Sequence, residues 1–288
     1  MDLINFGNND KSEHRSLVEM VCENLALPDS TFLGTRITKK MIIDNNELSS
    51  QDKKLVTDVI QSIDWQNTLK PETLNVAVYV TDTVEYIEIA VIRVVLKNTG
   101  NETNSKNKSK FNSSLLNKVA KLLHSLIPYP VILLLELGEE LAISLADKRI
   151  NQADKSKLVI EHIYNSDWLS SMGLTENENV FLNDFSLRNV SSLNYFELYQ
   201  DFISMLIGLE ISKISGYYLS KSSLYKNNED KTALLKELEG LEAELSSIRN
   251  KIKKETQMNT KMRLNVKAKD IKKNIRTIKD TFNGVLYK

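Results

Sequence analysis

Several features that define large classes of proteins are scarce or missing in this 288-residue sequence. The single cysteine, Cys22, excludes an intrachain disulfide, so nothing marks the chain as secreted. No apolar run approaches the roughly 18 residues of a membrane-spanning helix, and the N-terminus does not resemble a signal peptide. Lys and Arg number 38, as do Asp and Glu, which argues against a protein that coats nucleic acid or an anionic membrane with its whole surface. We therefore expect a cytoplasmic protein with no membrane partner.

The motifs of common enzymes and cofactor-binding folds are absent as well. The nine glycines are scattered, so no Gly-rich phosphate loop joins a strand to a helix. The histidines His14, His124 and His162 lie far apart, and we interpret each as a surface or packing residue. No Gly-x-Ser-x-Gly elbow is present, and Cys22 lies in an apolar helical context typical of a small core residue. The sequence predicts no cofactor and no metal ion.

The first two-thirds of the sequence alternate between helical and extended patterns. Apolar residues at helical spacing predict helices over 12–25, 49–63 and 114–127. Extended patterns predict strands over 74–80 and 84–97, and a strand or short helix over 158–164. The polar stretch 98–114 is interpreted as a mobile surface loop.

Residues 128–151 are the centre of the predicted core. Residues 131–137 form an almost uninterrupted apolar run, and a three-residue loop leads to a second strand over 141–146. Lys148 and Arg149 follow at the exit of this hairpin. Helices and hairpins interleaved in this way predict an α+β fold, in which helices pack on one face of a mixed or antiparallel sheet.

From residue 193 onwards the pattern is entirely helical. A packing helix is predicted over 194–215, and heptads follow the polar residues 226–230. The first heptad set is a candidate seam for docking or oligomerisation, and it consists of Leu234, Leu238, Leu241, Leu245, Ile248 and Ile252. A second set, in a different register, begins at Leu264. We predict an α+β domain over 1–228 and a coiled-coil helical hairpin over 229–288 that turns within 256–261, with an intermolecular coiled coil as the alternative.

Two groups of basic residues are candidates for binding phosphates or an acidic partner. The first would form where an early segment packs beside the hairpin exit, and it comprises Arg36, Lys39, Lys40, Lys148 and Arg149. The second lies within 249–279, where twelve Lys or Arg residues and two acidic residues give a net charge of +10. Its candidate contacts are Lys267, Lys272, Lys273 and Arg276. For both groups, a solvated cationic surface is the alternative.

A metal-dependent nuclease is the enzyme hypothesis that the residue pattern allows. Asp82 ends one predicted strand, and Glu85 and Glu88 lie near the start of the next, so their carboxylates could meet and hold Mg²⁺. The usual Glu-x-Lys is absent, because Ile89 and Ala90 follow Glu88. The alternative places Asp82 in a turn and both glutamates toward solvent.

Short blocks of the sequence resemble, in order, those of one bacterial family. The blocks are LPDST (27–31), TRITKK (35–40), LKPETLN (69–75), YIEIAVI (86–92), IPYP (127–130), ADKRIN (146–151) and SDW (166–168). The family is classified only as domain of unknown function 4391. Its usual proline is replaced by Thr38, which weakens the case for a rigid loop there but leaves the charges intact.

The resemblance implies an accessory protein found beside helicases and DNA methyltransferases in bacterial anti-phage or restriction-like islands, and it implies no catalytic residue. We therefore predict a non-catalytic accessory subunit of a DNA-processing defence complex. Its expected partner is a helicase-type or methyltransferase-type protein, with DNA as a second candidate. The nuclease and a structural oligomeriser acting through the first heptad set are the alternatives.

Overall fold

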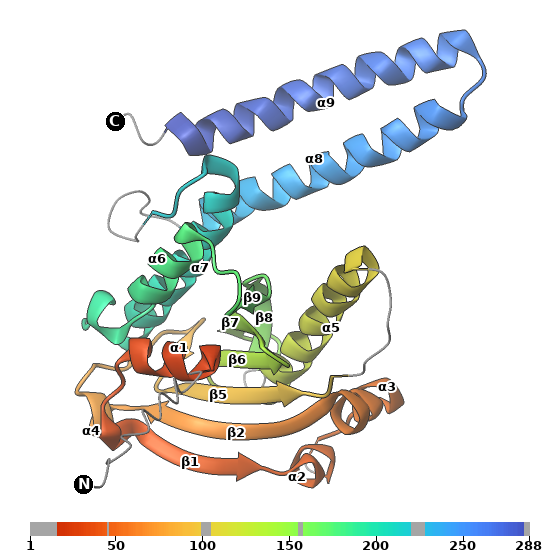
Figure 1. Cartoon of the computed structure of the whole chain (residues 1–288). Helices are drawn as coiled ribbons and strands as arrows, with labels where there is room; N and C mark the ends of the chain where they lie inside the picture. The colour runs from red at the N-terminus through yellow and green to blue at the C-terminus, as the bar shows by residue number, and fades with distance from the viewer. Residues whose placement is uncertain (1–15, 45, 99–104, 155–157, 220–227, 285–288) are drawn as a thin grey trace, which may run out of the picture.

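The computed structural model describes residues 16–44, 46–98, 105–154, 158–219 and 228–284, which form a sheet flanked by helices and a projecting pair of helices (Figure 1). The strands are β1 (Phe32–Ile37), β2 (Ile60–Leu69), β3 (Tyr79–Val80), β4 (Glu85–Tyr86), β5 (Ile89–Leu96), β6 (Val131–Leu137), β7 (Glu140–Ile150), β8 (Leu158–Asn165) and β9 (Leu169–Ser170). The α-helices are α1 (Leu17–Leu25), α2 (Lys39–Asp44), α3 (Ser50–Lys54), α4 (Pro71–Leu74), α5 (Ser105–Leu126), α6 (Glu176–Asp184), α7 (Tyr195–Ser215), α8 (Asn228–Lys254) and α9 (Met258–Gly284). Shorter helical turns span Asp29–Thr31, Leu55–Val59 and Leu187–Asn189.

The main sheet is mixed, as the sequence predicts. In the described part of the chain it has seven strands in the order β1-β2-β5-β6-β7-β8, with β9 also beside β7. Neighbouring strands are antiparallel except for β5 and β6, which are parallel. Parallel neighbours need a long crossover connection, and α5 lies within it. The short strands β3 and β4 form a separate two-stranded sheet.

Helices cover both faces of the sheet, so the prediction that they pack on one face is wrong. Ile89 and Val91 of β5 belong to a core that includes residues of α1, α6 and α7. Ala90 and Ile92 point to the other face, where the core includes residues of α2 and α5. Strands that are buried on both faces read as continuous apolar runs, which is the pattern of β5 and β6 in the sequence.

The predicted hairpin of residues 131–146 is confirmed as β6 and β7, but its dimensions differ. Leu137 pairs with Glu140, so two residues rather than three connect the strands. Gly138 has a φ of 65°, a left-handed conformation that suits glycine in this tight turn. β7 continues to Ile150, so Lys148 and Arg149 lie within a paired strand instead of at a hairpin exit.

The prediction of a helix over 49–63 is wrong beyond Val59. After α3 and one wide helical turn the chain enters β2, the second strand of the sheet. Ile60 and Ile63 are buried in the same core although they are three residues apart. A register shift between Ile60 and Ser62 places them on one face, because a bulge adds one residue to the usual alternation. The bulge therefore gives buried strand residues the three-residue spacing that is typical of a helix.

Two further predictions in this half of the chain are wrong. Residues 74–80 form mainly the end of α4 and a connection, because Pro71 starts a helical turn that Asn75 ends with a φ of 51°. Of the predicted loop 98–114, residues 99–104 lie outside the described residues, and 105–114 belong to α5. The buried apolar residues that the structure describes in α5 start at Leu115, and the sequence before it is mostly polar, so that stretch resembles a loop in the sequence.

The C-terminal part is helical, as predicted. Asn194 caps α7 by accepting a hydrogen bond from the Glu197 amide at 2.9 Å. The antiparallel helices α8 and α9 are joined by residues 255–257 and project as a helical arm from the body, which is formed by the elements that precede α8 (Figure 1). Leu238, Ile278 and Phe282 anchor the base of these two helices in the core that includes residues of α1, α6 and α7, called the main core below. None of the described helices combines the length and apolar composition needed to cross a bilayer.

Candidate functional site

The early basic residues lie at one end of the sheet. Arg36 is exposed on the edge strand β1, and Lys40 is exposed on α2. Lys39 instead donates to the Thr57 carbonyl at 3.3 Å, and Lys97 donates to the same carbonyl at 2.7 Å. Partial burial and the neighbouring Lys97 charge lower the pKa of Lys39. The strand order puts β2, β5 and β6 between this group and β7, a separation of about 19 Å at the usual strand spacing.

Lys148 is buried and does not contribute to a surface patch, which corrects the prediction of a phosphate site with Arg36, Lys39, Lys40 and Arg149. The residue is only 5% exposed. The ammonium donates to the carbonyls of Ile127 at 2.7 Å and Tyr129 at 2.6 Å. Burial lowers the pKa of Lys148 to about 7. Its role is to hold the connection between α5 and β6 against β7.

The other side of β7 is occupied by charged and polar pairs. Arg149 donates to Glu161 of β8 at 2.5 Å in a partly exposed ion pair. Asp147 accepts from the Tyr164 hydroxyl at 2.8 Å and from Gln200 of α7 at 2.6 Å. Burial raises the pKa of Asp147, and these two donors oppose the shift. The sequence block 146–151 therefore has a structural role, since it ties β7 to β8 and to α7.

The carboxylates of the nuclease hypothesis do not form a metal site. Asp82 lies in a turn, Glu85 lies on β4, and Glu88 lies near Tyr129, whose pKa is raised by burial and by the Glu88 carboxylate. Within the ranges that the structure describes, no three His, Cys, Asp or Glu side chains are placed to hold a metal ion. Burial also raises the pKa of the Cys22 thiol, which opposes a role for it as a nucleophile.

An ion pair on the sheet beside α1 was missed by the sequence reasoning. Arg93 of β5 forms two hydrogen bonds with Glu136 of the parallel neighbour β6. The bonds to Glu136 raise the pKa of Arg93. Both side chains are largely covered, so the pair joins two central strands and is no free cation for a ligand.

The first heptad set packs within the chain. Leu238 joins the main core, and Leu234 and Leu241 pack against it. Farther out, Leu245 and Ile248 of α8 form a separate apolar cluster with Ala268 and Ile271 of α9, against which Ile252 packs. The candidate oligomerisation residues are therefore on the seam between the two helices and on their base.

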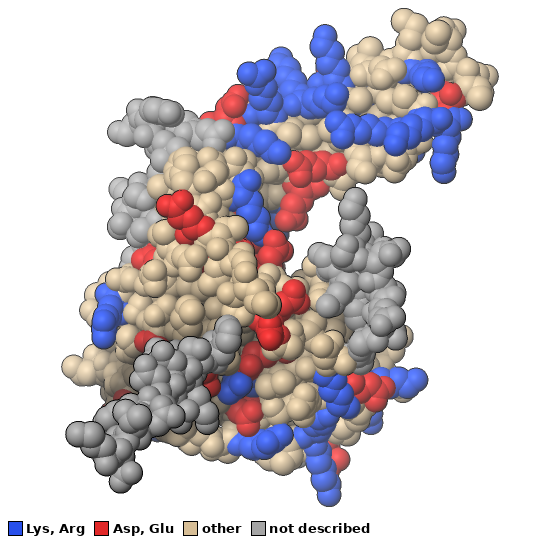
Figure 2. Space-filling view, in the orientation of Figure 1, with Lys and Arg blue, Asp and Glu red and all other residues tan. Residues whose placement is uncertain are grey.

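The opposite side of α9 carries exposed cations, the basic face of α9 (Lys269, Lys272, Lys273 and Arg276). These residues recur at three- and four-residue spacing and lie away from the buried seam. Figure 2 shows Lys and Arg along this helix, and acidic residues where the arm meets the body. Lys267 is not counted in the basic face, because its ammonium pairs with Glu244 of α8 at 2.7 Å. Arg276 pairs with Asp280, one turn farther along α9, at 3.8 Å, whereas Lys272 and Lys273 form no ion pair with a described residue.

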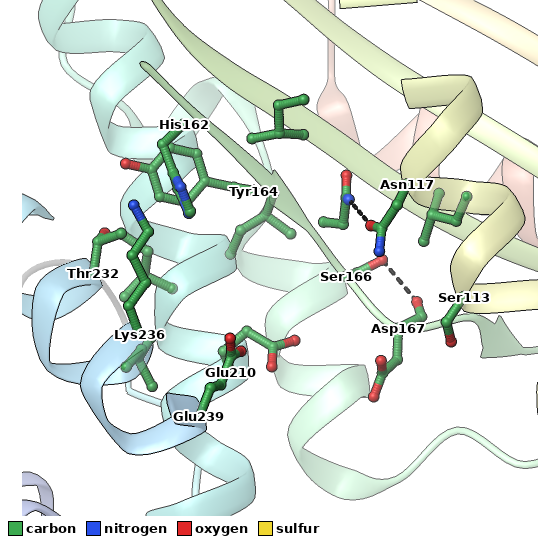
Figure 3. A pocket seen from close by; sticks show the side chains of 16 residues that line it. Ser113, Asn117, His162, Tyr164, Ser166, Asp167, Glu210, Thr232, Lys236 and Glu239 are labelled. Carbon is green, nitrogen blue, oxygen red and sulfur yellow. Dashed lines mark hydrogen bonds between the residues drawn. The ribbon is translucent and has the colours of Figure 1, made fainter. Parts of the chain in front are cut away.

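A groove beside β8 is the second candidate surface, and the sequence reasoning missed it. It has a volume of about 340 Å³, and its walls come from α5, α7 and α8. His162–Asp167 line its floor, and Figure 3 shows Glu210 and Glu239 beside each other across from Asp167. Lys213 bridges Asp167 at 2.7 Å and Glu210 at 2.6 Å. No local motif marks this groove, because its residues come from four separate elements.

The comparison with protein families identifies the chain. Residues 25–275 match the family described as Domain of unknown function (DUF4391), which is most of the sequence. The chain belongs to the DUF4391 family. The DUF4391 match includes the sheet, all of α8 and most of α9, so most of the arm lies within the region that defines the family. Comparisons with curated proteins and with solved structures give no match.

Proposed function

We propose that this DUF4391 protein is a non-catalytic accessory subunit of a bacterial DNA-processing defence complex, in which the helical arm contacts DNA. The observation that carries the proposal is the basic face of α9, a group of exposed cations on a projecting helix. The α+β body would hold a helicase-type or methyltransferase-type protein in the cytoplasm.

Charge and geometry support DNA as the ligand of the arm. The four cations extend over about 10 Å of helix, a length that spans several phosphates of a duplex. Because their side chains point away from α8, they can reach a phosphate backbone without unpacking the seam. No aromatic residue lies between them, which favours contacts to the backbone over stacking on bases.

The arm is suited to this role because it is anchored at one end and supported along its length. Leu238, Ile278 and Phe282 fix its base in the core of the body. The apolar cluster of Leu245 and Ile271 supports the helices farther out. We infer that the heptad seam makes an intramolecular antiparallel coiled coil, which holds the basic face at a fixed position relative to the body.

A salt titration of DNA binding tests the proposal. Reversing Lys272 and Lys273 to Glu together should weaken binding to a short duplex at least tenfold at 150 mM salt. It should also make the slope of log K against log salt less steep by about 2, because two phosphate contacts are lost. The matched control reverses Lys53 and Lys54, which are exposed on α3. Equal effects of the two double variants, or no binding by the unaltered protein, would remove the DNA assignment.

Incubation with plasmid and Mg²⁺ or Mn²⁺ tests the claim that the subunit is non-catalytic. We expect intact plasmid, because Asp82, Glu85 and Glu88 do not gather around a common point. Metal-dependent cutting that Glu88→Ala abolishes would replace the accessory role with the nuclease.

A further inference from the structure

The groove beside β8 exposes the open edge of the main sheet. Successive side chains of a strand point to opposite faces, so a cavity lined by each residue from His162 to Ser166 must run along the strand edge. β8 is the last strand in the sheet order, and in the part of the chain that the structure describes only β7 pairs with it. An edge strand directs a row of backbone N–H and C=O groups outward, where another extended chain can pair with them.

The walls of the groove determine which chain can enter. Leu116 and Asn117 of α5 form one wall, and Leu235 and Glu239 of α8 form the other. Figure 3 shows the strand running between α5 and the α7–α8 side, and on the α5 side the Asn165 amide of β8 donates to Asn117 at 2.8 Å. The side chains of the incoming segment would point alternately toward the two walls.

The charges favour a basic segment. Asp167, Glu210 and Glu239 line the groove together with one cation, Lys236, and Lys213 contacts only Asp167 and Glu210, so the carboxylates outnumber the cations by three to two. Glu239 forms no ion pair with a described residue. Burial raises the pKa of Glu210, Lys213 opposes the shift, and the charges of Asp167 and Glu239 add to it. His162 adds no positive charge at neutral pH, because burial and the nearby Lys236 lower its pKa to about 4. A cation between Glu210 and Glu239 would relieve this repulsion.

We propose that an extended, basic segment of the partner protein pairs with the edge of β8 and places an arginine or lysine between Glu210 and Glu239. This inference rests on the proposed function, since it names how the accessory subunit holds its protein partner. DNA is disfavoured here because the carboxylates repel phosphates. The chain's own basic element, α9, is disfavoured because a helix has no free backbone groups to pair with a strand.

The probe is a blocked pentapeptide of alternating valine and arginine, acetyl-VRVRV-amide, whose two arginines point to one face when extended. We expect saturable binding by calorimetry and slower hydrogen exchange in the segment 158–165. The same peptide N-methylated at all five residues cannot donate a residue N–H to the strand edge in either orientation and should bind at least tenfold more weakly. A peptide with glutamates in place of the arginines should not bind.

Two protein variants separate the groove from general charge. Glu210→Gln combined with Glu239→Gln should weaken binding of the arginine peptide at least tenfold, whereas Glu237→Gln, an exposed residue of α8 outside the groove, should change it less than twofold. Absence of binding at 1 mM peptide, or binding that is insensitive to N-methylation and to the double variant, overturns the inference. So does a dimer in sedimentation that the peptide dissociates, because a second copy then occupies the groove. DNA binding by the same preparations is the separate readout for the proposed function, which stands if only the peptide fails.

Discussion

At the scale of single residues, Lys148 shows that a charged side chain expected at a surface binding site can instead be buried and have a structural role. A Lys-Arg pair after an apolar run is typical of an exposed strand end, yet only Arg149 is near solvent. The difference arises because neighbouring strand residues point to opposite faces, and α5 covers the face toward which Lys148 points. Nothing local in the sequence encodes that cover, since α5 lies more than twenty residues upstream of Lys148 along the chain.

The buried ammonium of Lys148 makes stability depend on pH. Its pKa is about 7 in the folded protein and has an ordinary value of 10.5, so between these values the unfolded chain binds more protons. Stability should therefore rise from pH 7 toward pH 10, by up to about 1.4 kcal/mol per pH unit from this group. Lys148→Met should remove that rise while leaving the Ile127 and Tyr129 carbonyls unpaired, at a cost of about 1–3 kcal/mol.

Urea unfolding of the unaltered protein and of Lys148→Met at pH 7, 8 and 9 measures this effect. The comparison isolates Lys148, because the other titrating groups, including Lys231 with its lowered pKa, are common to both proteins. A constant difference in unfolding free energy across the three pH values contradicts the assignment.

At the scale of elements, the sequence predicts what periodicity and turn chemistry control. The β6–β7 hairpin follows from its apolar runs and Gly138, and α7 follows from its spacing and its Asn194 cap. The start of the bulged strand β2 is predicted as helix, because the bulge near Ile60 produces helical spacing without a helix. The groove beside β8 could not be predicted, because it depends on how α5, α7 and α8 pack around a strand edge.

The outer part of the helical arm should unfold locally without its base, because the two regions pack in separate apolar clusters. Ile271 packs in the outer cluster, whereas Ile278 belongs to the main core of the body. Ile271→Ala should remove about 2 kcal/mol or more of local packing and speed hydrogen exchange in the outer turns of α8 and α9. Exchange in β5 and β6 should stay unchanged.

Ile278→Ala is the matched substitution, and it should lower the stability of the whole body because its cavity lies in the core shared with α7. Global unfolding in urea and exchange by mass spectrometry distinguish the two cases. If Ile271→Ala lowers the global midpoint as much as Ile278→Ala does, the arm and body unfold as one unit.

At the scale of the whole molecule, a net charge of zero conceals a strong separation of charge. Residues 249–279 carry +10, so the remainder of the chain carries −10. The basic face of α9 points away from α8, whereas the groove is lined by residues of α8 and of the body; Figure 2 shows Lys and Arg along the arm and acidic residues where the arm meets the body. If the two proposed ligands bind as inferred, the polyanion and the basic protein segment would each meet a surface of opposite charge.

The two surfaces should therefore act independently. Two helix diameters, about 20 Å, separate them, which exceeds twice the Debye length of about 8 Å at physiological salt. Lys272→Glu with Lys273→Glu should weaken DNA binding and leave the affinity for the arginine peptide within twofold. Glu210→Gln with Glu239→Gln should do the reverse, and saturating DNA should not displace the peptide. Competition between the two ligands, or a double variant that weakens both, would mean that arm and groove form a single site for one partner.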